Sequence, residues 1–212
     1  MRYNGSFALT DTDVIVRLIA ENPWATLVSH TSTGLVASHY PVILDDEAGE
    51  LAILTHVGRP DEEIHELGQH ELLVIIQGPH GYISSSWYDE KPAVPTWNFI
   101  TAHLSGVPDV LTAEENLRVL ARLVDRFEDP VSHPRRILAT PDDAAYARRT
   151  ALGTAGLRLT PTKIVAKQKM SQNRPEPIVT AIMAELDGNG PYASAGLARE
   201  MRLARSAADR EN

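Results

Sequence analysis

Residues 78–99 read GPHGYISSSWYDEKPAVPTWNF, and the interpretation of the whole chain starts from this stretch. It holds two of the three tryptophans, three consecutive serines, one histidine and three prolines. Proline removes a backbone donor and restricts the residue before it, so Gly78-Pro79, Lys91-Pro92 and Val94-Pro95 predict a fixed, extended loop. Rigid loops with aromatic walls and hydroxyl donors are typical of ligand sites.

The composition is that of a globular protein, because 43% of the 212 residues are hydrophobic and 23% are charged. The chain has no apolar run long enough for a membrane helix and no signal-peptide pattern at its start, so we expect a cytoplasmic protein with no role at a membrane. The absence of cysteine excludes disulfides, thiolate metal sites and covalently attached haem. A net charge of -8 argues against nucleic-acid binding as the main task, although several arginines gather late in the chain.

Hydrophobic periodicity and turn residues predict about six strands and several helices. The expected strands are 25–30, 34–44, 51–56, 72–77, 96–107 and 156–169, and the expected helices are 11–21, 60–67, 112–127, 142–149, 177–186 and 193–205. Thr112 and Glu115 form a capping box at the start of the third helix. The strands do not alternate regularly with helices, which favours an antiparallel barrel with attached helices over a doubly wound sheet.

The common nucleotide, zinc and esterase motifs are absent, so the candidate chemistry lies in the opening stretch. Hydroxyls of Ser84, Ser85 and Ser86 are potential donors to an anionic group, and the rings of Tyr82, Trp87, Tyr88 and Trp97 are potential walls for a flat ligand. A structural loop whose tryptophans fill the core explains the same residues equally well. His80 and His103 are candidates for acid–base or ligand roles, and a structural role is open for each.

The order of motifs along the chain resembles that of the PaiB-like, FMN-binding split-barrel proteins, many of them negative transcriptional regulators. The resemblance rests on residues 78–99 and on NPWATLVS, SHYPVIL, LTHVGR, VIIQGP and KMSQNRP, which follow in the family's order. It implies a mainly β, α+β fold: a six-stranded antiparallel split barrel with peripheral and C-terminal helices. It also implies a homodimer with a flat cofactor held between the protomers. We expect the split-barrel domain to span residues 1–170 and a helical segment, packed on the barrel or on the partner subunit, to span 171–212.

The sequence departs from the regulators after LTHVGR, where it reads RPDEEIHELG. Ile64 stands where the regulators have an aromatic residue, and His65 stands where they have lysine. The family has a haem-dependent branch, the piperazate synthases, which is similar in nearly every other motif and holds the haem iron with a histidine. By this resemblance His65 is the predicted axial ligand of haem b, with His56, His80 and His103 as further candidates and with Glu62 or Glu66 orienting the ring. Without the resemblance, a solvent-facing histidine on an acidic helix is the simpler interpretation.

The resemblance therefore implies an enzyme: a haem-dependent piperazate synthase that forms the N–N bond of piperazic acid by dehydrative cyclisation of N5-hydroxyornithine. Arg59, His80 and Arg174 are the candidate catalytic residues, the arginines as partners for the substrate carboxylate. The alternatives are an FMN-binding PaiB-like negative transcriptional regulator, and a flavin or haem oxidoreductase of the same barrel superfamily. The sequence also predicts that a His65→Ala variant stays folded, because a helix-surface histidine contributes little to stability.

Overall fold

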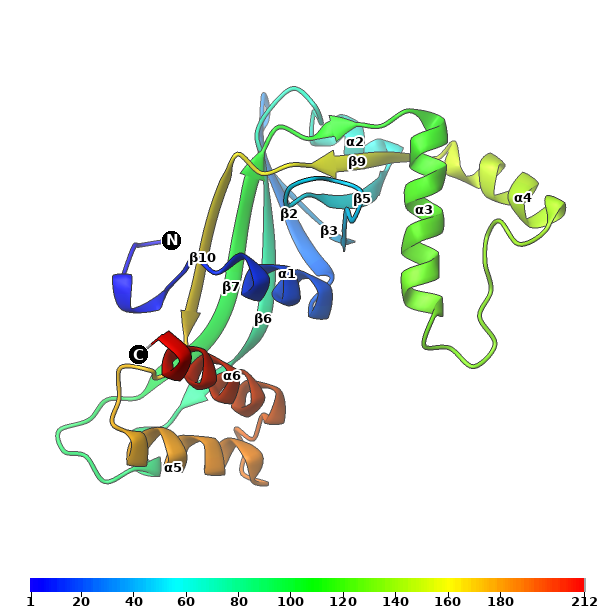
Figure 1. Cartoon of the computed structure of the whole chain (residues 1–212). Helices are drawn as coiled ribbons and strands as arrows, with labels where there is room; N and C mark the ends of the chain where they lie inside the picture. Colours follow the sequence, from blue (N-terminus) through cyan, green and yellow to red (C-terminus); the bar gives the residue numbers. More distant parts are fainter. Residues whose placement is uncertain (212) are drawn as a thin grey trace. The chain divides into compact units, whose positions relative to one another are not determined.

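A computed structural model describes the backbone of residues 1–211 and the side chains of residues 1–206 (Figure 1). The described strands are β1 Ala8–Leu9, β2 Trp24–Thr31, β3 Gly34–Pro41, β4 Ile43–Leu44, β5 Ile53–Gly58, β6 Leu72–Ile83, β7 Thr96–Gly106, β8 Asp109–Val110, β9 Thr154–Leu159 and β10 Lys163–Lys169. The helices are α1 Thr12–Glu21, α2 Arg59–Ile64, α3 Ala113–Glu128, α4 Pro141–Ala151, α5 Glu176–Asp187 and α6 Ala195–Glu211. Two short 3-10 helices span Gly5–Phe7 and Ser85–Trp87. No helix in this part of the chain is long and apolar enough to cross a membrane.

The strands form two sheets, with the orders β1-β10-β7-β6-β2-β3 and β4-β5-β9-β8. Strand β2 pairs antiparallel with β3 and with β6, and β5 pairs antiparallel with β4 and with β9. In the hairpin of β2 and β3, Thr31 lies opposite Gly34, whose φ of 124° suits a residue without a side chain. The predicted α+β class with antiparallel strands is confirmed.

The prediction of an irregular loop from Gly78 onward is wrong for its first six residues. Strand β6 continues through Gly78-Pro79 and ends only at Ile83. The pairing of β6 with β2 ends at Ile75, so the missing N–H of Pro79 costs no hydrogen bond to that neighbour. The irregular part of the stretch begins at Ser84 and ends where β7 starts at Thr96.

The predicted last strand over 156–169 is also wrong in its continuity, because it is two strands. Residues 160–162 separate β9, in the four-stranded sheet, from β10, in the six-stranded sheet. The N–H of Thr162 donates to the carbonyl of Ser105 at 2.9 Å, which fixes the break. Together with the two-residue strands β1, β4 and β8, this break explains why about six expected strands became ten described ones.

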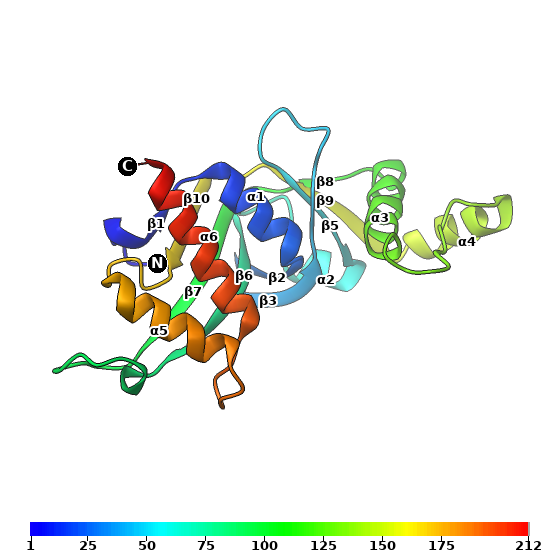
Figure 2. The same ribbon diagram turned by 60° about the horizontal axis from the view of Figure 1, so that its bottom comes forward.

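The chain divides into two compact units, and each is described by itself. The first unit contains residues 1–11, 77–102 and 165–212, and the second contains 12–76 and 103–164. In the first unit α5 and α6 lie side by side (Figure 2). Their buried apolar side chains are Val179, Ile182, Leu186, Leu197, Ala198 and Met201. The division at residue 170 that the sequence suggests stays a prediction.

In the second unit α3 begins at the predicted capping box, in which Thr112 and Glu115 bond each other's backbone N–H groups. Val119 and Leu123 of α3 pack with Leu54 of β5. A Cβ at Gly156 of β9 would lie 2.9 Å from the Cα of Asn116, so only glycine permits this helix to approach the strand so closely. The tight contact places α3, and α4 after it, against β9.

Candidate cofactor site

An exposed cluster of aromatic side chains lies in the first unit, and we call it the aromatic face. It consists of His80 and Tyr82 from β6, Trp97 from β7 and Tyr192 from the segment before α6. The ring of Trp97 stacks on His80 with centroids 6.4 Å apart and meets Tyr82 edge-on at 6.3 Å. The rings of Tyr82 and Tyr192 are 4.9 Å apart. Trp97 remains 55% exposed and Tyr192 51%, so the face is available to a flat ligand.

His80 is the one histidine of the aromatic face, and its hydrogen bond fixes its tautomer. Nδ1 lies 3.0 Å from the carbonyl oxygen of Gly78. A carbonyl only accepts, so Nδ1 donates to it, and in the neutral form of the ring Nε2 has the lone pair. Backbone carbonyls often orient metal-binding histidines in this way. His80 is exposed, and its imidazole therefore has the geometry of a potential ligand.

The three serines form a local turn. Ser84 caps the 3-10 helix over Ser85–Trp87: its Oγ accepts from the N–H of Ser86 at 3.2 Å and lies 2.7 Å from the Ser86 hydroxyl. No hydrogen bond is described for the Ser85 hydroxyl. Trp87 and Tyr88 line an open hollow of about 600 Å³ together with Ser85, Ser86 and residues 89–91 and 93. Of the three predicted hydroxyl donors, Ser85 is therefore available, and the contact between Ser84 and Ser86 uses the proton of only one of them.

Two cations of the first unit already have partners. Arg174 pairs with Glu90 at 2.7 Å, and Lys169 donates a hydrogen bond to the hydroxyl of Thr96. Burial, helped by the charges of Lys167 and Arg174, lowers the pKa of Lys169. An anionic ligand that binds Arg174 must displace Glu90 or share the guanidinium with it.

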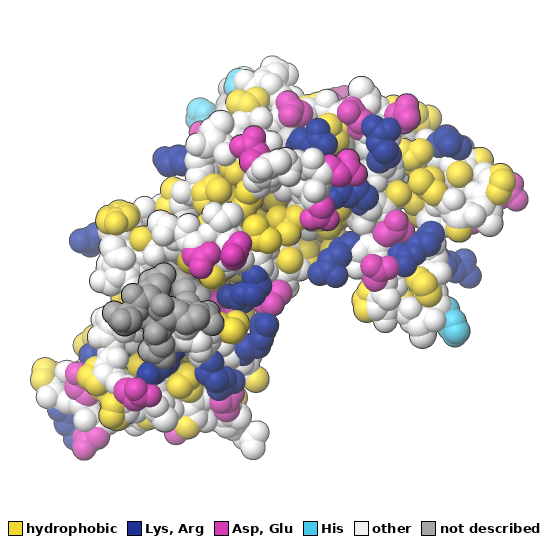
Figure 3. All heavy atoms as spheres, in the orientation of Figure 1, with side chains coloured by type: hydrophobic (Ala, Val, Ile, Leu, Met, Phe, Trp, Pro, Cys, Tyr) yellow, Lys and Arg dark blue, Asp and Glu magenta, His cyan; other side chains and the backbone are white. Residues whose placement is uncertain are grey.

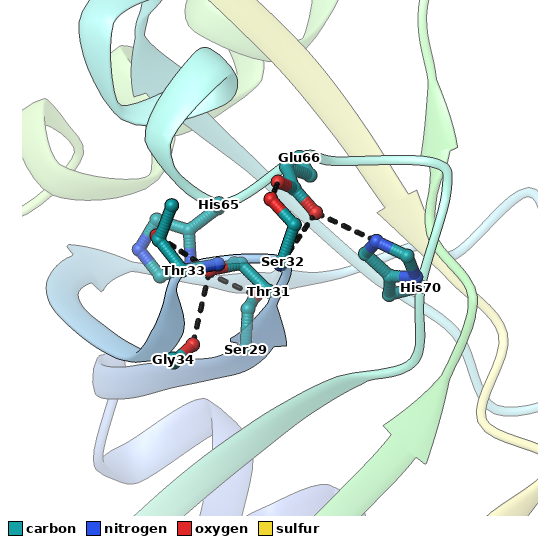
Figure 4. A network of polar contacts seen from close by, with 8 residues as sticks. All are labelled: Ser29, Thr31, Ser32, Thr33, Gly34, His65, Glu66 and His70. Carbon is teal, nitrogen blue, oxygen red and sulfur yellow. Dashed lines mark hydrogen bonds and ion pairs between the residues drawn. The ribbon is translucent and has the colours of Figure 1, made fainter.

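His65 belongs to the second unit, where it is buried against one face of the β2–β3 hairpin (Figure 4). It follows α2, is 1% exposed, and places Nδ1 2.8 Å from Ser29 Oγ of β2. Its Nε2 lies 3.0 Å from Ser38 Oγ of β3. Burial lowers the pKa of His65 although Asp61 opposes the shift, so the ring is neutral near pH 7. We call this arrangement of Ser29, Ser38 and His65 the serine cradle.

The carboxylate of Glu66 forms a clasp on the β2–β3 turn beside the serine cradle (Figure 4). It accepts from the N–H of Ser32 at 3.1 Å, from the Ser32 hydroxyl, and from His70 Nε2 at 2.7 Å. These contacts, the Ser32 hydroxyl first, lower the pKa of Glu66. Glu66 adopts a φ of 48°, a left-handed conformation that the clasp helps to hold.

The expected carboxylate partner of His65 is wrong. Glu66 binds the turn, and Glu62 binds Arg59 at 2.6 Å, so two serine hydroxyls hold the ring instead. Ile64 is 53% exposed, whereas the solvent-facing position considered for His65 is not observed. Because the imidazole is buried and holds both serines, the reason to expect that His65→Ala leaves stability unchanged no longer applies.

The serine cradle does not fit a haem ligand as it stands, because both ring nitrogens have partners and the side chain is enclosed. His65 must give up the Ser38 hydroxyl before it binds iron. The aromatic face fits the cofactor better, since His80 offers an open Nε2 beside a large exposed ring. Among the described residues no three His, Asp or Glu side chains gather in a metal-binding group.

The structure therefore brings together some predicted residues and separates others. His80, Tyr82 and Trp97 form one face, and Ser84, Ser85, Ser86, Trp87 and Arg174 lie in the same unit, whereas Arg59, Ile64 and His65 belong to the other unit. Sequence reasoning missed Ser29, Ser38 and Tyr192. Ser29 was detectable, because every second residue of β2 is buried and Ser29 lies on the same side of the strand as Ala25 and Leu27. A buried hydroxyl needs a hydrogen-bond partner.

Comparison with known proteins identifies the family. Residues 1–163 match the family model described as "Putative FMN-binding domain". The chain belongs to this FMN-binding family. It is 30% identical over 172 residues to the Protease synthase and sporulation protein PAI 2 of Bacillus subtilis (strain 168), covering 80% of this chain and 81% of the relative. The PaiB-like assignment made from the motifs is thereby confirmed at the level of the family.

Solved structures support the fold. The flavocytochrome Anf3 from Azotobacter vinelandii aligns with a TM-score of 0.58 and 12% identity, over 80% of this chain and 72% of that chain. The FAD and heme binding protein from Mycobacterium smegmatis aligns with a TM-score of 0.57 and 17% identity, over 87% of this chain and 81% of that chain. At these identities the likeness concerns the fold alone.

Proposed function

We propose that this protein is a haem-dependent enzyme of its family, a piperazate synthase that binds haem b against the aromatic face. The observation that carries the proposal is His80, which has Nδ1 fixed by Gly78, an open Nε2 and the exposed ring of Trp97 beside it. A neutral imidazole with this orientation is a standard haem ligand. His65, the ligand that the family resemblance implies, is the competing candidate and must first leave the serine cradle.

The chain's own residues have separable roles in this proposal. Trp97 and Tyr82, whose ring planes are 72° apart, would contact the flat cofactor from different directions, and His80 would hold it. Bound iron would supply a Lewis acid for the N–O bond of an N5-hydroxyornithine-like substrate, whose α-amine closes the N–N bond as water leaves. Arg174 lies in the same unit as the aromatic face and is the candidate partner for the substrate carboxylate, in exchange for Glu90.

We also propose that the protein is a homodimer whose second copy covers the aromatic face. A cluster in which Trp97 is 55% exposed and Tyr192 is 51% exposed is unusual on a monomer. Light scattering is expected to give twice the 23.3 kDa chain mass at micromolar concentration. A monomer mass with the cofactor still bound contradicts a site enclosed between protomers.

The second candidate is an FMN-binding PaiB-like negative transcriptional regulator, and two observations favour it. The matching family is described as FMN-binding, and the relative from Bacillus subtilis is a sporulation protein by name. The same aromatic face accommodates an isoalloxazine ring. Against DNA binding, the net charge is -8, and acidic side chains lie among the basic ones on the face shown in Figure 3.

An absorption spectrum of the untreated protein separates the two candidates. Haem gives a Soret band, and we expect this band, whereas flavin bands contradict the enzyme proposal and favour the regulator. The same spectrum of His80→Ala and His65→Ala then identifies the ligand. We expect His80→Ala to lose or shift the Soret band and His65→Ala to keep it whenever the variant is folded.

His39→Ala is the matched control, because His39 is an exposed histidine that stacks on Trp24 in the second unit. A Soret band that changes in His65→Ala and not in His80→Ala assigns the iron to the serine cradle instead. Turnover is tested with N5-hydroxyornithine, with mass spectrometry to detect the loss of one water. If the protein binds haem but forms no such product, the proposed cyclase activity is contradicted. The remaining candidate is then a haem oxidoreductase of the same superfamily.

A further inference from the structure

A second cavity lies in the second unit, between α3, α4 and the strands β5 and β9. Its volume is about 410 Å³, which is within the range of small-molecule sites. The walls are largely apolar, and they include Leu120, Val124, Ile137, Tyr146 and Ala147. Of the candidate iron ligands only His56 is in its lining, and no residue of the aromatic face or of the serine cradle lines it.

Among the uncharged polar groups of the lining, the hydroxyls of Thr150 and Thr154 already donate to the carbonyls of Tyr146 and Ala151, which directs attention to His56 from β5. Its Nδ1 is enclosed and has no hydrogen-bond partner among the described residues. No partner is described for Nε2 either, and this atom is not enclosed, so it borders the cavity that the ring lines. Burial lowers the pKa of His56, so the ring is neutral near pH 7.

The two nitrogens of His56 are not equivalent. A neutral imidazole carries one proton, and an enclosed N–H without an acceptor is rarer and costlier than an enclosed acceptor without a donor. The proton therefore belongs on Nε2, where it points to the cavity. A molecule that fills the cavity has to offer this N–H an acceptor oxygen, because an unpaired donor would otherwise be cut off from water.

The charges at the rim indicate that the occupant is uncharged. Arg136 is held by Asp125 at 3.2 Å and by Asp129 at 2.5 Å, so its charge is balanced. The remaining charged side chains of the lining are Arg135 and Asp143, which have opposite signs. A ligand with a net charge would be attracted by one of these two side chains and repelled by the other.

We propose that this cavity binds an uncharged, flat aromatic carbonyl compound, with the carbonyl oxygen accepting a hydrogen bond from His56 Nε2. The apolar walls take the ring system, and the unpartnered imidazole of His56 favours molecules that have an acceptor at one end. The site is separate from the aromatic face and does not depend on which cofactor that face binds.

The probes are acetylnaphthalene and ethylnaphthalene, which have nearly the same shape and differ in the carbonyl. Their dissociation constants are measured by equilibrium dialysis against the purified, cofactor-containing protein. We expect both to bind and the ketone to bind about fivefold more tightly, because a net hydrogen bond is worth roughly 1 kcal/mol. In His56→Phe the preference for the ketone is expected to vanish while ethylnaphthalene binds as before.

Two further variants complete the test. Ala147→Phe fills the cavity and is expected to abolish the binding of both probes. His39→Phe makes the same substitution as His56→Phe at a histidine outside the cavity, and it is expected to keep the preference for the ketone. Failure of both probes to bind the wild type overturns the proposal. So does equal affinity for the two probes, a ketone preference that survives His56→Phe, or binding that requires removal of the cofactor. The His56 variant keeps the test valid if Ala147→Phe does not fold.

Discussion

Two histidines proposed as iron ligands occupy opposite environments, His80 on the aromatic face and His65 in the serine cradle. His80 is exposed, uses one ring nitrogen for its own strand and leaves the other open. His65 is 1% exposed and uses both nitrogens to connect β2 with β3. An imidazole that already has two hydroxyl partners contributes to stability, and one with an open nitrogen beside an exposed tryptophan is available to a ligand.

The same contrast applies to the aromatic residues of the two units. Trp97 is 55% exposed within a cluster of four rings, while Trp24 is 64% exposed and stacks on His39 alone at 6.5 Å. Single exposed apolar residues are normal on protein surfaces, whereas clusters indicate binding. The clustering of the aromatic face, and not the exposure of any one ring, is therefore what favours it as the cofactor site.

The largest effect is expected for stability, in the variant His65→Ala. Removal of the ring leaves a cavity and two serine hydroxyls without their partner, which costs about 2–4 kcal/mol. Urea unfolding followed by far-UV circular dichroism measures the change. The matched variant His80→Ala is expected to stay within roughly 0.5 kcal/mol of the wild type, because its ring is exposed. Equal stabilities of the two variants would remove the distinction between a structural and a binding histidine.

A smaller effect, on cofactor affinity, is expected for Trp97→Ala. Loss of a stacked aromatic ring costs about 1–1.5 kcal/mol of binding, or roughly a tenfold rise in the dissociation constant of the cofactor. Titration of the cofactor-free protein with haem or FMN measures it. Trp24→Ala is the control with a similar exposure, and it is expected to leave the affinity unchanged. If both tryptophans matter equally, the site is not confined to the aromatic face.

Features that depend on neighbours in sequence were predictable, and the capping box of α3 is the clearest case. Thr112 and Glu115 are three residues apart, and the structure has both of their reciprocal bonds. The irregular loop was predicted from three X-Pro pairs, and the prediction failed at the first of them, Gly78-Pro79. A proline can stand in a strand where its missing N–H has no neighbouring strand to pair with. In β6 this depends on β2, whose pairing with β6 ends at Ile75, before Pro79.

The serine cradle could not be predicted from residues close to His65 in sequence, again because its contacts depend on strand pairing. The partners of His65 are 36 and 27 residues away in sequence, in two strands whose pairing brings the hydroxyls together. The acidic residues beside His65 suggested carboxylate partners, but helix geometry directs Glu62 toward Arg59 and the left-handed Glu66 toward the turn. Only the alternation of β2, which places Ser29 on its buried side, indicated that a distant polar group was required.

The smallest effect concerns the clasp of Glu66, and it depends on pH. The pKa of Glu66 is lowered in the folded protein, mainly by the Ser32 hydroxyl, from an ordinary value of 4.5. A depressed carboxyl pKa means that the stabilising contribution is present above pH 4.5 and is lost as the pH falls through the folded-state value. Glu66→Gln removes the charge at every pH, so we expect the variant to be slightly less stable at pH 7 and to converge with the wild type in acid. Thermal unfolding at pH 7 and pH 3 measures this difference.

Glu114→Gln is the control, because Glu114 is an exposed carboxylate on α3 that pairs only with Arg118. A difference between Glu66→Gln and the wild type that stays constant down to pH 3 would show that the carboxylate charge does not hold the β2–β3 turn beside the serine cradle.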